Sequence, residues 1–285
     1  MESSRAPKLL EMESSIAAPA VFFQPVVPIY REKVGKLSTS AGRFVYAVIL
    51  PNGKVSLDLL GLDGCKVYMI LYRDVAAVVS DYPVGTVSLI RKNLSPYHDV
   101  TRRFAEICTT IPARFGQIAE DGEEVLGLLR RHYPRIRKEL ERLDQKVEMG
   151  VKVFWETDDF FGALVHSDTE LRELRNRAFS KQSPPTTLEL IQLGEFVSHR
   201  IKTRKEAISQ KVVSVLRTAS AEEKLDESGE DKIIMSGWFL VSKARQGDFV
   251  ELVNKAASLI GEEYAVKVGG PWAPFNFVEH IELEM

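Results

Sequence analysis

The chain of 285 residues has very little cysteine: only Cys65 and Cys108 occur, far apart and without a CxxC spacing. A disulfide framework or a structural zinc site needs more cysteines, or closer ones, so this composition disfavours both. We expect the two thiols to be reduced and half-buried, where they pack as small hydrophobic side chains. A reducing compartment, the cytoplasm, fits this usage best.

Long apolar runs and net charge are also scarce. Residues 16–30 are apolar, but Pro19, Pro25 and Pro28 interrupt them, so the run is too short and broken to span a bilayer. The net charge of −2 gives no reason to expect nucleic acid or a membrane as partner. Residues 1–41 therefore form either a tail lying across the protein or an arm whose apolar side chains meet an apolar partner, namely Val21, Phe22 and Phe23.

Recognisable catalytic and cofactor motifs are absent as well. The five histidines are scattered, and no HExxH, GxGxxG or GxSxG occurs. The glycine-rich residues 61–66 lack phosphate-loop spacing and precede an expected strand, which makes them a turn. The acidic pairs Glu123/Glu124 and Asp158/Asp159 stand at helix starts, where they stabilise the helix dipole. The sequence thus predicts no catalytic residue, no cofactor and no metal.

What is present is an alternation of strand and helix patterns. In the first half, Ser95 and Pro96 have the residue types of a helix start, and Pro134 should kink or split a second helix. The expected elements are a strand at 43–50, a hairpin of 66–72 and 75–82 turning at Arg73-Asp74, a helix at 95–110, a short strand at 112–118 and a helix at 121–146.

The second half repeats this alternation. Its expected elements are a strand at 147–155, a helix to about 179, a long helix from Thr187, a polar loop at 219–232, a strand at 232–242, a helix at 247–261 and a strand at 264–269. This order is one strand short of the split βαβ pattern, and residues 275–283 are a candidate for the missing strand. The pattern predicts an α+β protein with antiparallel and mixed sheets.

One short run, Pro112-Ala113-Arg114-Phe115-Gly116, stands out because it places an arginine in a β-like segment. There Arg114 would be partly buried and would need an acceptor. It either forms a structural ion pair with an acid such as Glu148 or anchors a carboxylate of a partner.

Several motifs then follow in a specific order: Val45-Tyr46-Ala47-Val48, the run 72–80, His98, the run 111–116, the run 148–153 and the closing run 270–278. Together they resemble the gas vesicle protein F/L family over roughly residues 43–279. Ala273 and Phe275 stand where the family pattern has proline and tyrosine. Each motif alone is weak, but the ordered set is specific.

The resemblance implies a non-enzymatic accessory protein of gas vesicles, and a C-terminal domain with a modified ferredoxin-like fold. Such proteins are thought to bind the hydrophobic major shell protein, with other accessory proteins as further partners, and to keep it from aggregating. We expect a tail (1–41), an α+β domain (42–146), the ferredoxin-like domain (147–270) and a second tail (271–285). The alternative is a small-ligand or regulatory ferredoxin-like module. Besides the N-terminal arm, the candidate partner contacts are Trp272, Phe275 and Phe277.

Overall fold

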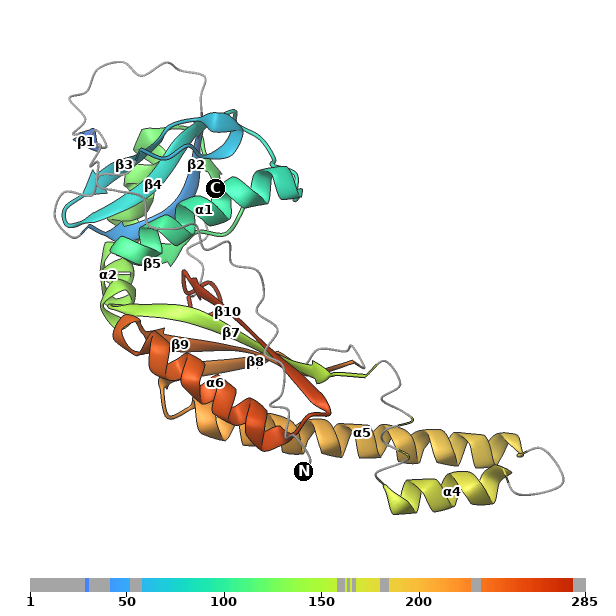
Figure 1. Ribbon diagram of the computed structural model, residues 1–285. Coiled ribbons are helices and arrows are strands. Elements are labelled where there is room, and N and C mark those ends of the chain that lie inside the picture. The colour runs from blue at the N-terminus through green and yellow to red at the C-terminus, as the bar shows by residue number, and fades with distance from the viewer. Residues whose placement is uncertain are drawn as a thin grey trace. The chain divides into compact units, whose positions relative to one another are not determined.

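The computed structural model of the chain describes residues 29–30, 42–51, 58–157, 162, 165, 168–179, 185–226 and 232–278. The chain divides into two compact units (Figure 1). The N-terminal unit contains the described residues of Ser15–Met149 together with Leu240–Ala244 and those of Gly270–Met285. The C-terminal unit contains those of Gly150–Phe239 and Arg245–Gly269. Both units mix helices with sheets, which confirms the α+β class.

The N-terminal unit is built on a sheet of order β1-β3-β4-β2-β5, with β6 also paired to β2. Strands β2, β3, β4, β5 and β6 pair antiparallel, whereas β1 runs parallel to β3. Its elements are β1 Ile29–Tyr30, β2 Gly42–Leu50, the 3-10 turn η1 Leu62–Gly64, β3 Val67–Tyr72, β4 Val75–Tyr82, α1 Arg91–Ile107, β5 Thr109–Pro112, β6 Ile118–Ala119 and α2 Gly122–Arg142.

Strand β2 lies at the centre of this unit because nearly all its side chains are apolar. Eight of its nine residues are buried, as expected of a strand covered on both faces. Helix α1 covers one face and α2 the other (Figure 1). The predicted hairpin is confirmed, with β3 and β4 joined at Arg73, whose φ is +55°. Helix α2 is also confirmed: the Asp121 side chain accepts a hydrogen bond from the Glu124 backbone N–H, and the helix continues through Pro134 without splitting.

Two predictions for this unit were wrong. Helix α1 begins at Arg91, four residues before Ser95, so Pro96 lies inside it. The N–H groups of Asn93 and Leu94 already donate to the Ile90 carbonyl, and proline removes only its own donor. Residues 112–118 do not form one strand either. The chain leaves β5 at Pro112 and turns before β6, and the turn contains Gly116 with φ of +90°.

The C-terminal unit takes its sheet from four strands in the order β10-β7-β9-β8. Helices α5 and α6 pack side by side, and α4 packs on α5 (Figure 1). Its elements are β7 Lys146–Trp155, α4 Thr169–Phe179, α5 Thr187–Leu216, β8 Ser220–Asp226, β9 Ile233–Ser242, the 3-10 turn η2 Lys243–Arg245, α6 Gln246–Ile260 and β10 Tyr264–Trp272. The unit boundaries fall within β7, β9 and β10.

The polar segment predicted as a loop at 219–232 is in fact strand β8 over much of its length. A polar strand is stable there because β8 lies at the end of the sheet order and pairs on one side only with another described strand. The missing strand is therefore β8, and the described residues 275–278 form turns instead. The order β-α-β-β-α-β is that of the split βαβ motif. The ferredoxin-like assignment, which also depends on strand directions, stays a prediction.

Candidate functional site

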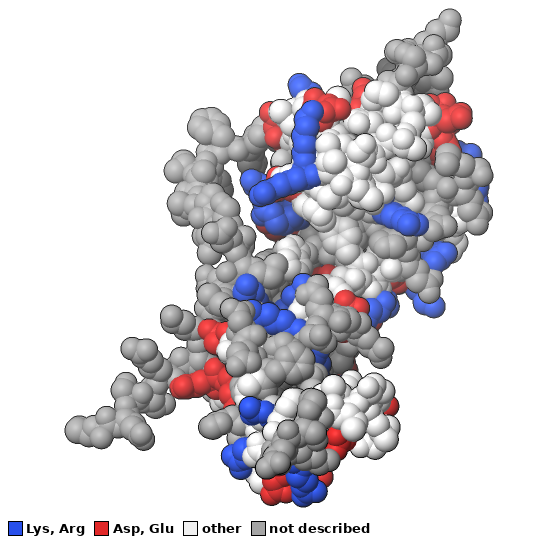
Figure 2. Space-filling view, turned by 90° about the vertical axis from the view of Figure 1, so that its right-hand side faces the viewer, with Lys and Arg blue, Asp and Glu red and all other residues white. Residues whose placement is uncertain are grey.

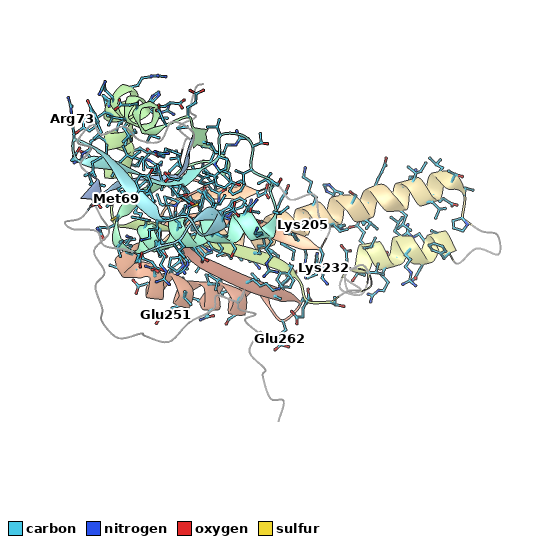
Figure 3. All side chains as sticks on the ribbon, turned by 90° about the horizontal axis from the view of Figure 1, so that it is seen from above. Met69, Arg73, Lys205, Lys232, Glu251 and Glu262 are labelled. Carbon is cyan, nitrogen blue, oxygen red and sulfur yellow. The ribbon has the colours of Figure 1, made fainter. Side chains whose placement is uncertain are left out.

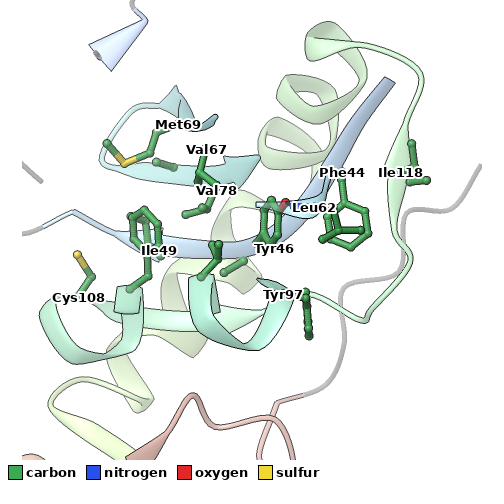
Figure 4. Packing of buried hydrophobic residues seen from close by; sticks show 14 residues of the cluster. Phe44, Tyr46, Ile49, Leu62, Val67, Met69, Val78, Tyr97, Cys108 and Ile118 are labelled. Carbon is green, nitrogen blue, oxygen red and sulfur yellow. Dashed lines mark hydrogen bonds between the residues drawn. The ribbon is translucent and has the colours of Figure 1, made fainter. Parts of the chain in front are cut away.

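The motif residues of the N-terminal unit meet around Tyr97 on α1. The ring centroid of Tyr97 lies 5.2 Å from that of Phe115 and 6.0 Å from that of Phe275. Phe44 and Tyr46 of β2 complete this aromatic cluster, at 6.2 and 6.3 Å. Figure 4 shows Phe44, Tyr46 and Tyr97 close together between the strands and α1. Residues far apart in the sequence thus form one side of the hydrophobic core.

The two tyrosines of this cluster are hydrogen-bonded and buried. Tyr97 Oη donates to the Ala113 carbonyl, and Tyr46 Oη lies 2.9 Å from Ser80 Oγ. The Leu62 backbone N–H donates to Tyr46 Oη over 2.8 Å. Burial raises the pKa of both Tyr46 and Tyr97 above the usual phenol value, since the charged form loses its hydration. Both phenols are therefore neutral structural groups, unsuited to acid–base chemistry at neutral pH.

The C-terminal segment 273–278 is fixed to this same unit by side chains that recognise its backbone. The buried Glu148 carboxylate accepts from the Asn276 backbone N–H at 2.8 Å and from Asn276 Nδ2 at 2.7 Å. Arg142 Nη2 donates to the Phe277 carbonyl at 2.6 Å. Charge-assisted bonds of this kind are stronger than neutral ones. The segment thus packs on the N-terminal unit. The expectation that residues 275–283 complete the sheet of the C-terminal domain would have placed it on the other unit.

The predicted site residues fall into three groups. Phe277 is only 4% exposed and Phe275 half-buried, so both contribute to packing, whereas Trp272 is half-buried at the end of β10. Pro112 is buried at the end of β5, but Arg114 is exposed in the turn, contrary to the expectation of partial burial. Its pairing with Glu148 stays a prediction. The arm residues Val21, Phe22 and Phe23 lie outside the described residues.

An exposed apolar surface that was not predicted from the sequence lies at the C-terminal end of α4 and the N-terminal end of α5. We call it the hairpin tip, and it consists of Phe179, Leu188, Leu190 and Ile191, which are 58, 64, 47 and 52% exposed. The part of α5 before Lys205 runs alongside α4 and beyond the sheet of its unit (Figure 3). Figure 2 shows the molecule from the end of the α4–α5 pair, where white, uncharged residues lie beside acidic and basic ones.

The start of α5, within the hairpin tip, is stabilised by a helix cap and carries no buried side chain. Thr186 and Glu189 form a capping box at the start of α5, in which each side chain bonds the other residue's backbone N–H. No residue between Thr187 and Ala207 is buried. The signal in the sequence was the spacing of Leu188, Leu190 and Ile191, which places apolar side chains on more than one face of a helix.

The described part of the chain contains no group of three or more histidine, cysteine or acidic side chains placed to hold a metal ion. Cys65 and Cys108 are free thiols, as predicted. None of the helices in the described ranges has both the length and the apolar character needed to cross a membrane.

Comparisons with known proteins give a consistent result. The family model described as "Gas vesicle synthesis protein GvpL/GvpF" matches residues 42–279. Gas vesicle protein F of Nostoc sp. (strain PCC 7120) is 23% identical over 243 residues, covering 84% of this chain and 99% of that protein. Gas vesicle protein L of Streptomyces sp. (strain CB03234) is 28% identical over 265 residues, covering 85% and 94%.

The fold is shared with two crystal structures of gas vesicle protein GvpF. The protein from Anabaena sp. PCC7120 superposes with a TM-score of 0.75 at 23% identity, over 85% of this chain and all of that chain. The protein from Microcystis aeruginosa gives a TM-score of 0.68 at 21% identity, over 83% and 98%. At this identity the likeness establishes the common fold.

Proposed function

Because the chain belongs to the GvpL/GvpF family of gas vesicle synthesis proteins, we propose that it binds the hydrophobic shell protein and prevents its aggregation during vesicle formation. In this role the protein works in the cytoplasm at the growing vesicle, together with other accessory gas vesicle proteins, and performs no catalysis. The observation that carries the proposal is the family match across nearly the whole described chain.

The hairpin tip supplies the physical means for this function. A shell subunit with an apolar face aggregates until it is placed in the vesicle wall, so a protein that holds it in solution needs an accessible apolar surface. Four exposed large apolar side chains at one end of α4 and α5 provide such a surface. We place the shell-protein contact at the hairpin tip rather than at the aromatic residues of the C-terminal segment, since Phe277 is buried and Phe275 packs against Tyr97.

The test is a pull-down of the tagged full chain expressed together with the genes of a gas vesicle cluster. The proposal expects the shell protein to be retained, and to be released when the apolar contact is weakened by mild detergent. If the shell protein is not retained while other vesicle proteins are, the protein works elsewhere in assembly. Washing intact vesicles and probing both fractions then determines whether the protein remains in the wall.

A further inference from the structure

The middle of α2 carries basic side chains without acidic ones between them. Five of residues 130–138 are arginine or lysine, and none is acidic. The acidic residues of the helix stand near its two ends instead, namely Glu123, Glu124, Glu139 and Glu141. Helices that face water usually mix the two signs, because acidic and basic side chains one turn apart attract each other. The charges of α2 are therefore segregated along its length.

Three of these basic side chains are exposed and unpaired. Arg130, Arg131 and Lys138 are exposed, and no ion pair or side-chain hydrogen bond joins them to the rest of the chain that the structure describes. Helical geometry places Arg131 and Lys138 on one side of α2, about 10 Å apart along its axis, with Arg130 next to them. We call these three side chains the basic face. Arg137, in contrast, is paired with Asp74 at 2.8 Å.

Arg73, in the turn between β3 and β4, stands at the border of the basic face. Its guanidinium carbon lies 4.7 Å from the ring centroid of Tyr133 on α2 and 5.4 Å from that of Tyr72 (Figure 3). Tyr133 is one helical turn from Arg130. Arg73 is exposed and forms no ion pair with a described residue. Because stacking holds the planar guanidinium in place, less freedom is lost when it binds an acceptor.

The fold holds the basic face together in spite of its charge. Like charges within a screening length repel each other, and like-charged neighbours on a helix destabilise it. The opposite side of α2 is buried in the N-terminal unit through Val125, Leu129 and Ile136. Packing of that apolar side therefore fixes the basic side chains next to one another. A binding partner of opposite charge would remove the repulsion and form ion pairs in its place.

The composition of the basic face favours protein carboxylates over a membrane or nucleic acid. Helices that bind membrane surfaces carry large apolar side chains beside the basic ones, whereas the exposed residues between Arg131 and Lys138 are Pro134 and Arg135. Sites for single-stranded nucleic acid stack bases on aromatic rings, but Tyr133 is already covered by Arg73. The arginine fork matches a carboxylate in shape and charge.

We propose that the basic face, with Arg73 at its border, binds an acidic segment of a partner protein. The segment presents carboxylates about two helical turns apart, which matches the spacing of Arg131 and Lys138. The proposal goes beyond shell-protein binding and does not depend on it, because α2 and the hairpin tip belong to different units of the chain.

Fluorescence anisotropy with a synthetic peptide tests this binding without any vesicle protein. The probe is a labelled, alanine-rich helical peptide with glutamates one and two turns apart, and its glutamine version is the blank. The full chain should bind the glutamate peptide more tightly than the blank, and salt should weaken the binding by screening. The triple variant Arg130→Gln, Arg131→Gln, Lys138→Gln should bind it about tenfold more weakly, as expected for the loss of several surface ion pairs.

The control is the triple variant Arg103→Gln, Arg175→Gln, Lys255→Gln. It removes the same residue types and the same total charge at exposed positions on α1, α4 and α6. It should bind the glutamate peptide like wild type. Equal weakening in both triple variants would overturn the proposal, since net charge alone would then explain the binding. A wild-type chain that does not distinguish the glutamate peptide from the blank would overturn it as well.

Two further probes and a stability measurement complete the test. An oligothymidylate or a phosphatidylserine vesicle that binds the basic face more tightly than the glutamate peptide would show that the partner is not an acidic protein segment. Thermal unfolding of the Arg130, Arg131 and Lys138 triple variant should occur at or above the wild-type temperature, because the repulsion is gone. A lower temperature would mean that these side chains serve the fold, contrary to the proposal.

Discussion

Glu148 shows at the scale of single residues how the N-terminal unit retains its C-terminal segment. Its carboxylate is buried and holds both the backbone and the side chain of Asn276. A buried carboxylate is costly unless its hydrogen bonds are made. Glu148 and Asn276 therefore depend on each other, although 128 positions separate them in the sequence.

Replacing Asn276 by alanine removes one of these bonds and leaves a buried charge less satisfied. We expect Asn276→Ala to lower the free energy of unfolding of the N-terminal unit by about 1.5–3 kcal/mol, the usual value for a hydrogen bond to a charged group. Urea unfolding, followed by hydrogen exchange of α1 amides, measures the change. The matched control Asn254→Ala, at an exposed position on α6, should change it little. Equal effects of both variants would contradict this account of Glu148.

His98 gives a prediction for pH. His98 is exposed on α1, but its ring lies beside those of Tyr97 and Phe275, and the partial loss of hydration on that side lowers the pKa of His98 below its usual value, while nearby Asp99 offsets this in part. As pH falls below about 6.5, His98 of the unfolded chain binds a proton, whereas His98 of the folded chain binds one only at a lower pH. The stability that neutral His98 contributes is thus complete above that pH and is lost as pH falls through its folded pKa.

Thermal unfolding between about pH 7.5 and 5.5, around the usual histidine pKa, measures this dependence. His98→Gln should show a smaller loss of melting temperature over that interval than the wild-type chain. An identical pH dependence in both proteins would show that His98 does not contribute.

At the scale of elements, the sequence predicted well where apolar periodicity was strong. Strands β2, β3, β4 and β7 and helices α2 and α6 lie close to their predicted ranges, because burial of their apolar faces determines them. Two predictions failed because local residue types pointed elsewhere. Ser95-Pro96 has the residue types of a helix start but lies within α1, and the polar β8 is stabilised by its place at the sheet edge.

The C-terminal segment should contribute strongly to the stability of the N-terminal unit. Phe277→Ala removes a buried aromatic side chain, and we expect a loss of about 3–5 kcal/mol, typical of such truncations. Phe179→Ala makes the same change at the exposed hairpin tip and should have almost no effect on stability. Thermal unfolding of the two variants measures the difference. If Phe277→Ala unfolds at the wild-type temperature, the segment does not support the fold.

Helix α5 should respond locally to the loss of its cap. Thr186→Ala breaks the capping box and should cost about 1 kcal/mol of helix stability. Because no residue in the first half of α5 is buried, the opening should stay local. Hydrogen exchange should therefore quicken in peptides from residues 187–196 and stay unchanged in 208–216. Faster exchange along the whole helix would show that α5 unfolds as one unit.

At the scale of the whole molecule, the sequence indicated the family and the fold class but not the path of the chain between units. Residues 271–285 were expected to be a separate tail, yet the motifs at 111–116 and 270–278 meet Glu148 within the N-terminal unit, around Tyr97, whereas residues 150–153 belong to the C-terminal unit. Contacts between such distant segments leave no periodic pattern in a single sequence. The hairpin tip was missed for a related reason: only the structure shows that no other described element covers these side chains.

The aggregation of purified shell protein, followed by light scattering in the presence of the full chain, tests the central claim most directly. The wild-type chain should delay aggregation, and the double variant Leu188→Ser, Ile191→Ser should lose most of this delay while remaining folded. Leu60→Ser is the control, because Leu60 is 60% exposed and Leu188 64%, but Leu60 lies in the N-terminal unit; it should act like wild type. A wild-type chain that leaves the aggregation rate unchanged would contradict the account.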